Sequence, residues 1–140
     1  PVSPGRPAPR SNRKRHDMKL QFLTPALHGA LDYIAAGALI VLPFLLGLQG
    51  LELWLSVAGG AALILYSLLT DYRFGVVKLL NFDLHLVLDL SAGVAFLIAP
   101  FILGFSLAAT IYYPIMALGV MAVVAATMRS GSATMQLASA

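Results

Sequence analysis

Two stretches of the chain decide its fold: LHGALDYIAAGALIVLPFLLG at residues 27–47 and LHLVLDLSAGVAFLIAPFILG at residues 84–104. They align without gaps at an offset of 57 residues, and the same offset brings Thr70 onto Thr127. Each stretch has roughly the 20 apolar residues that a helix needs to cross the hydrocarbon core of a bilayer. The repeated unit is therefore a helix and its successor, which together predict a pair of membrane crossings.

Composition and charge placement support the same class. Of the 140 residues, 59% are apolar and 11% are charged, whereas a soluble domain is about 45–50% apolar and about 25% charged. No Asp, Glu, Lys or Arg occurs in residues 33–51, 53–70 or 90–128, windows that fit one, one and two crossings. The helices of a soluble protein would need a polar face, and these windows have none. The absence of cysteine excludes disulfides, thiol nucleophiles and cysteine-based metal sites.

The predicted fold is an all-α integral membrane four-helix bundle built from two tandem parallel helical hairpins. Each hairpin returns the chain to its starting side, so the two copies share one orientation. Thr24 is a suitable cap and Pro25 a suitable first residue for the first helix. We expect helices at about residues 25–46, 52–70, 83–103 and 109–128. The segments are a basic Pro-rich tail (1–17), the first hairpin repeat (18–73), the second hairpin repeat (74–130) and a polar C-terminal tail (131–140).

The outer ends of the first and third helices carry matching residues. Pro43 and Pro100 remove a backbone hydrogen bond and should kink each helix or begin its end. Gly47 and Gly104 follow four residues later, where they suit helix termination before the outer turn. Three aromatic residues predict a belt at the interface beyond these turns: Trp54, Tyr112 and Tyr113.

All basic residues lie on one predicted side of the bundle. Five of the nine are in residues 1–15, and the others are Lys19, Arg73, Lys78 and Arg129. The positive-inside rule then places both termini of the multi-pass protein in the cytoplasm. Because the positive charge is largely a property of the tail, we expect a lipid bilayer and other membrane subunits as partners, and no nucleic acid.

Two histidine–aspartate pairs are the main candidates for chemistry. His28 and Asp32 are four residues apart, as are His85 and Asp89, so each pair shares one face of its helix. Ionisable residues within a membrane face the bundle interior and mark functional sites by default. In a first interpretation they join helices, and the residues of this interhelical packing are His28, Asp32, Pro43, His85, Asp89 and Pro100.

Two further interpretations stay open. His28 and His85 are candidate ligands of haem or (bacterio)chlorophyll, with Asp32 and Asp89 orienting the imidazoles. Alternatively, Asp32 and Asp89 pass protons or small ions across the membrane in a transporter. No catalytic residue and no metal-ion ligand is predicted, and the chain is not expected to be an enzyme.

A short motif resembles a known family. LPFLLGL (42–48) and APFILGF (99–105) are similar to the motif of the SPW-repeat family of small bacterial membrane proteins. Pro and Gly match that motif, whereas Phe44 and Phe101 replace its Trp, and Leu42 and Ala99 replace its Ser. The resemblance covers residues 25–130 in outline and implies four crossings of a bacterial membrane. It implies no activity, cofactor or catalytic residue.

Together these features predict a small, non-catalytic integral membrane subunit that packs against larger membrane partners. An accessory or assembly subunit of an energy-converting (photosynthetic or respiratory) complex would have this character. The alternatives are the haem- or chlorophyll-binding electron-transfer protein and the transporter.

Overall fold

The computed structural model describes residues 23–138 of the chain. Within this range the chain forms four α-helices and no β-strand, which confirms the predicted all-α class. The predicted basic tail, residues 1–17, lies outside the described residues. The helices are α1 (Pro25–Leu45), α2 (Gly50–Leu68), α3 (Phe82–Leu103) and α4 (Leu107–Ala138).

Helix ends follow local sequence signals. Thr24 caps α1 as predicted, since its hydroxyl accepts a hydrogen bond from the backbone N–H of Leu27 at 3.2 Å. Asn81 caps α3 in the same way, through the N–H of Leu84 at 2.8 Å. Gly47 and Gly104 follow the last helical residues with φ angles of 68° and 65°, a left-handed conformation that glycine adopts without steric cost. Their predicted role in ending α1 and α3 is confirmed.

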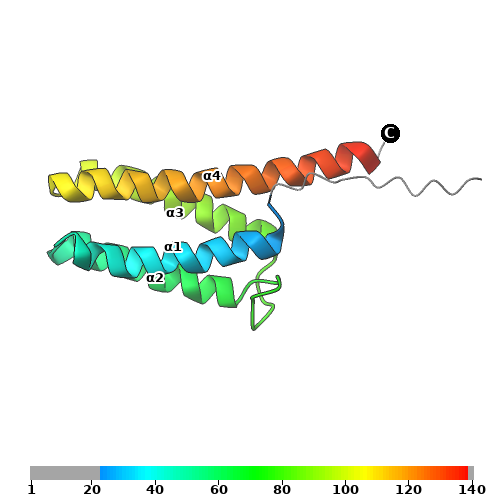
Figure 1. Cartoon of the computed structure of the whole chain (residues 1–140), viewed down its shortest axis with the longest axis horizontal. Helices are drawn as coiled ribbons and strands as arrows, with labels where there is room; N and C mark the ends of the chain where they lie inside the picture. Colours follow the sequence, from blue (N-terminus) through cyan, green and yellow to red (C-terminus); the bar gives the residue numbers. More distant parts are fainter. Residues whose placement is uncertain (1–22, 139–140) are drawn as a thin grey trace, which may run out of the picture.

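The four helices form two closely packed pairs. α1 packs mainly along α2, and α3 packs mainly along α4. In Figure 1 the α1–α2 and α3–α4 turns lie together at one end of the molecule. The start of α1 and the α2–α3 connection (69–81) lie at the opposite end. These two ends are called the turn end and the connection end.

Each pair has one contact between a glycine and the backbone of an alanine. A Cβ added to Gly60 of α2 would lie 2.8 Å from the backbone oxygen of Ala36 in α1. In the other pair, a Cβ added to Gly93 of α3 would lie 3.6 Å from the backbone oxygen of Ala117 in α4. Ala36 and Gly93 are equivalent in the repeat, as are Gly60 and Ala117, so both pairs use the same contact with the two residue types exchanged. A glycine against an alanine lets two helix backbones approach closely.

All four helices are long and apolar enough to cross a membrane, over the spans Pro25–Leu45, Gly50–Leu68, Phe82–Leu103 and Leu107–Met128. The fourth helix differs from expectation because it continues to Ala138 instead of ending near residue 128. Residues 131–138, expected as part of a polar tail, are therefore helical. This segment contains Ala, Met, Gln and Leu and no proline, and such residues favour a helix whether or not it is apolar.

The predicted aromatic belt at the turn end is only partly present. Trp54 is 61% exposed, but Tyr112 and Tyr113 are 5% and 0% exposed. The two tyrosines are buried because their hydroxyl groups bond across to α2, to Ser56 Oγ and to the backbone oxygen of Glu52. These two residues therefore face the interior of the bundle and not its outer surface.

Candidate functional site

The two histidine–aspartate pairs meet in one buried cluster near the connection end. His28 and Asp32 come from the first two turns of α1, and His85 and Asp89 from the first two turns of α3. One possible ligand atom from each of the four side chains lies within 4.8 Å of the other three. All four are buried, the most exposed being Asp32 at 6%. These four residues are called the histidine–aspartate cluster.

The closest contacts within the cluster run between α1 and α3. His28 Nε2 lies 2.9 Å from Asp89 Oδ2 but 3.5 Å from Asp32 Oδ1 in its own helix. His85 Nε2 lies 3.0 Å from Asp32 Oδ2 and 3.2 Å from Asp89 Oδ2. Each imidazole is therefore bound more closely to the aspartate of the other repeat, and the cluster joins the two helix pairs.

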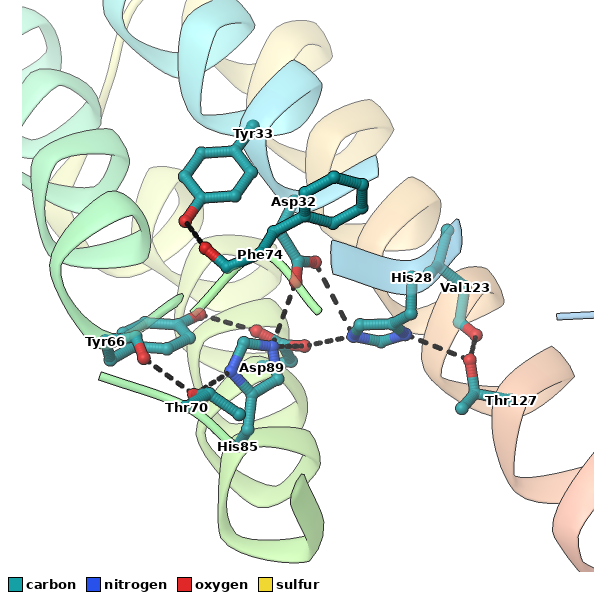
Figure 2. Close-up of polar contacts among 10 residues, drawn as sticks. All are labelled: His28, Asp32, Tyr33, Tyr66, Thr70, Phe74, His85, Asp89, Val123 and Thr127. Atoms are coloured by element: carbon teal, nitrogen blue, oxygen red, sulfur yellow. Dashed lines mark hydrogen bonds and ion pairs between the residues drawn. The ribbon is translucent and has the colours of Figure 1, made fainter. Parts of the chain in front are cut away.

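Two threonines hold the outer nitrogens of the imidazoles (Figure 2). His28 Nδ1 lies 2.9 Å from Thr127 Oγ1 in α4, and His85 Nδ1 lies 2.9 Å from Thr70 Oγ1, just after α2. Thr70 and Thr127 are equivalent in the repeat. Each histidine thus contacts both the aspartate and the threonine of the other repeat, so the arrangement is reciprocal.

Tyr66 breaks this symmetry. Its hydroxyl donates a hydrogen bond to Asp89 Oδ1 at 2.5 Å, as Figure 2 shows. The equivalent position in the second repeat is Val123, which has no hydroxyl to offer Asp32. Asp89 therefore has three side-chain partners, the two histidines and Tyr66, and its surroundings are more polar than those of Asp32.

Aromatic rings cover the cluster on the connection side. The Phe82 ring stacks on His85 with a centroid separation of 6.0 Å and an interplanar angle of 15°. Tyr72, in the α2–α3 connection, meets His85 edge-on at 5.6 Å. A Cβ at Gly29 would overlap the Tyr72 ring, so the glycine beside His28 makes room for this cover. Burial raises the pKa of Tyr72 to about 12, which keeps its hydroxyl neutral.

An apolar cavity of about 90 Å³ lies between the helices beyond the cluster. Tyr66 belongs to its lining and is the link to the cluster, since its hydroxyl bonds Asp89. The other lining residues are apolar side chains and glycines: Leu39, Gly59, Ala62, Leu63, Ala92, Gly93, Phe96, Met116, Ala117 and Val120. This lining offers no series of polar groups that would carry ions from the cluster towards the turn end.

A second polar contact joins the helix pairs at the turn end. The carboxylate of Glu52 in α2 accepts hydrogen bonds from the backbone N–H and the hydroxyl of Ser106, at 2.9 and 3.0 Å. Ser106 precedes α4, and its hydroxyl also accepts a bond from the N–H of Ala109. The hydroxyl of Tyr113 donates to the backbone oxygen of Glu52 at 2.6 Å. This Glu52–Ser106 contact is more exposed than the cluster.

The contacts of the imidazole nitrogens help to distinguish an interhelical role of the two histidines from haem or chlorophyll ligation. Within the described residues, every imidazole nitrogen of His28 and His85 faces a threonine hydroxyl or a carboxylate. The two rings meet edge-on with centroids 5.4 Å apart. An axial ligand of haem or chlorophyll needs a free nitrogen facing the macrocycle. Binding of such a cofactor would require both rings to leave their carboxylates, so this arrangement favours the interhelical interpretation.

The six residues expected in interhelical packing are all buried: His28, Asp32, Pro43, His85, Asp89 and Pro100. The structure also adds residues that were not predicted as part of a site. Thr70 and Thr127 were visible in the repeat alignment, which was the signal for them. Tyr66, Glu52 and Ser106 have no matching partner in the other repeat, so comparison of the two copies did not single them out.

Comparisons with known proteins identify no relative: no family model, no curated protein and no solved structure matches the chain. The resemblance to the SPW-repeat family therefore stays a prediction from the two short motifs.

Proposed function

We propose that this chain is a non-catalytic integral membrane protein of two tandem parallel hairpins that packs laterally against larger membrane proteins. The histidine–aspartate cluster connects the two helix pairs inside the bundle and fixes their relative arrangement. An accessory or assembly role in an energy-converting complex fits this character. The proposal extends to a bacterial inner membrane, in line with the resemblance to the SPW-repeat family.

The observation that carries the proposal is the contrast between the inside and the outside of the bundle. Large aliphatic side chains on every helix point outward and are more than half exposed: Ile34 (68%), Leu65 (61%), Ile102 (75%) and Ile115 (63%). Soluble monomers rarely expose apolar patches of such extent. The polar groups of the cluster are buried and bonded to one another, as polar groups in a membrane must be. Lipid or apolar protein is therefore the suitable surrounding.

Charge distribution supports the orientation. Arg73 and Lys78 lie in the α2–α3 connection, at the end where α1 begins. The turns at the opposite end, residues 46–49 and 104–106, contain no basic residue. The positive-inside rule then puts the connection end in the cytoplasm.

Labelling of single cysteines tests the membrane topology, because the natural chain has no cysteine. Lys78→Cys and Gln49→Cys place exposed thiols at the connection end and the turn end. In intact cells, a membrane-impermeant maleimide should label the second variant only, and permeabilisation should expose the first. Labelling of both from the same side, or recovery of the protein from the aqueous fraction, contradicts the proposal.

Lateral packing is tested by photo-crosslinking in the native membrane. A crosslinking residue at the outward Leu65 should give defined adducts with another membrane protein. The same residue at Gln49, an exposed position at the turn end whose side chain does not cap α2, serves as the matched control for non-specific capture. Adducts that are absent, or equal at both positions, would oppose a partner-binding role.

A further inference from the structure

We infer that the histidine–aspartate cluster is a closed binding site for a single Zn²⁺-like divalent cation. This goes beyond the proposed function, which requires only that the cluster join the helix pairs. It also departs from the expectation of no metal ligands, because the sequence did not show that the two pairs meet.

The hydroxyl groups of Thr70 and Thr127 donate to backbone oxygens and not to the imidazoles. The hydroxyl of Thr127 donates to the backbone oxygen of Val123 at 2.8 Å, and that of Thr70 to the backbone oxygen of Tyr66 at 2.6 Å. A hydroxyl has one proton, so each threonine oxygen has only lone pairs left for the imidazole beside it. The Nδ1 atoms of His28 and His85 must therefore carry hydrogen and donate it to the threonines.

The Nε2 atoms of His28 and His85 face the carboxylates. A neutral imidazole with hydrogen on Nδ1 has a lone pair on Nε2. Both Nε2 atoms point at carboxylate oxygens, which also carry lone pairs, at distances of 2.9–3.5 Å. Four acceptor groups facing one another in a buried space repel unless positive charge lies among them. Added protons or a metal ion among these groups would relieve the repulsion.

The cluster has the same net charge with two added protons as with a divalent cation. Two imidazolium ions with two carboxylates have no net charge, and neither have two neutral imidazoles and two carboxylates around a divalent cation. Binding of M²⁺ with release of the two Nε2 protons thus leaves the buried charge at zero. This matters because a net charge in a low-dielectric environment costs several kcal/mol, roughly the effective penalty per buried ion.

The distances fit a tetrahedral ion. Zn²⁺ binds imidazole nitrogen at about 2.0–2.1 Å, so two ligands in tetrahedral geometry lie about 3.3 Å apart. The four histidine–aspartate separations, 2.9, 3.0, 3.2 and 3.5 Å, lie on both sides of that value, and the two that involve Asp32 use different oxygens of its carboxylate. One possible ligand atom from each side chain lies within 4.8 Å of the other three, so a contraction of the cluster around the ion would complete the coordination shell.

The surroundings complete the site. Metal-bound histidines usually donate their other N–H to a fixed acceptor, and ligating carboxylates are themselves hydrogen-bonded. The two threonines and Tyr66 supply these contacts. Two imidazoles and two carboxylates favour Zn²⁺ over Mg²⁺ or Ca²⁺, which prefer oxygen ligands and higher coordination numbers.

The test is metal binding by the whole chain, purified in mild detergent with a tag that lacks histidine. We expect the protein to bind one equivalent of Zn²⁺ and to release about two protons per ion. After exchange of Zn²⁺ for Co²⁺, the bound Co²⁺ should show the visible absorption of a tetrahedral site. Mg²⁺ should not compete. A folded, helical wild-type protein that takes up neither ion, or that binds one without proton release, overturns the inference.

Variants locate the site. Asp32→Asn should abolish the Co²⁺ spectrum, and Thr70→Val should weaken binding by roughly 10- to 100-fold, the usual effect of losing a group that orients a ligand. His16→Ala, a change of the third histidine of the sequence, should leave binding unchanged. Unchanged binding in both cluster variants would place the metal elsewhere and refute the site. Failure here would leave the topology and crosslinking results of the proposed function intact.

Discussion

At the scale of single residues, the two aspartates of the cluster occupy equivalent positions in the repeat, yet their surroundings differ. Asp89 Oδ2 lies 2.9 Å from His28 Nε2 and 3.2 Å from His85 Nε2, and Asp89 Oδ1 accepts a hydrogen bond from Tyr66, whereas Asp32 has one close histidine and a second at 3.5 Å. The same side chain thus makes unequal contributions in the two copies.

Replacement of the two aspartates should show this difference. We expect Asp89→Asn to lower the free energy of unfolding by about 3–5 kcal/mol, the cost of removing one member of a buried pair. Asp32→Asn should cost clearly less, since it leaves all three partners of Asp89 in place. The measurement is reversible unfolding in detergent micelles followed by circular dichroism. Equal losses, or a larger loss for Asp32→Asn, would contradict the assigned contacts.

Tyr72 gives a prediction at alkaline pH. Its pKa is raised to about 12 by burial, whereas a tyrosine in the unfolded chain has a pKa of about 10. Between these two pKa values the unfolded state loses the Tyr72 proton while the folded state keeps it. The free energy of unfolding is therefore undiminished below about pH 10 and falls as the pH rises towards 12. Over that range wild-type stability should fall more steeply than that of Tyr72→Phe. Parallel unfolding midpoints for the two proteins would show that the hydroxyl is not buried.

At the scale of elements, close packing of each helix pair depends on a glycine opposite an alanine. The two pairs place the glycine on opposite helices, Gly60 on α2 and Gly93 on α3. The helix backbones approach closely here whichever helix provides the glycine.

Gly60→Ala tests this contact. The added Cβ would lie 2.8 Å from the backbone oxygen of Ala36, which cannot move independently of α1. We expect a loss of about 1–3 kcal/mol in the free energy of unfolding, the usual cost of overpacking. Gly37→Ala is the matched control, because its Cβ would meet nothing within 4 Å, and it should be neutral or slightly stabilising through helix propensity. Similar effects for both variants would mean that steric contact with Ala36 is not the cause.

The sequence predicted the elements well, because each depends on local signals. Apolar windows free of charge gave four helices, and Thr24, Gly47 and Gly104 marked ends that the structure confirms. The end of α4 was missed because small polar residues suit both a helix and a tail. Composition alone does not separate those two states.

At the scale of the whole molecule, the internal repeat was informative only for residues present in both copies. It singled out the histidines, the aspartates and the threonines, which form the reciprocal part of the cluster. It did not show which aspartate each histidine binds, since a pattern along one helix gives no distance to another helix. Tyr66 and Glu52 correspond to Val123 and Ala109, so their contacts have no signal in the repeat.

The two helix pairs are joined at opposite ends of the bundle, by the cluster and by the Glu52–Ser106 contact. Along α2, Glu52 and Tyr66 are separated by about 20 Å at the helical rise. Changes at sites so far apart should be independent, whereas changes within the cluster share partners. In double-mutant cycles on the detergent-solubilised protein, Glu52→Gln and Asp89→Asn should therefore be additive within about 0.3–0.5 kcal/mol. Asp32→Asn and Asp89→Asn should deviate from additivity by about 0.5–3 kcal/mol, because both bind the same two imidazoles. Strong coupling between the distant pair would instead show that the helix pairs move as one body that both ends control together.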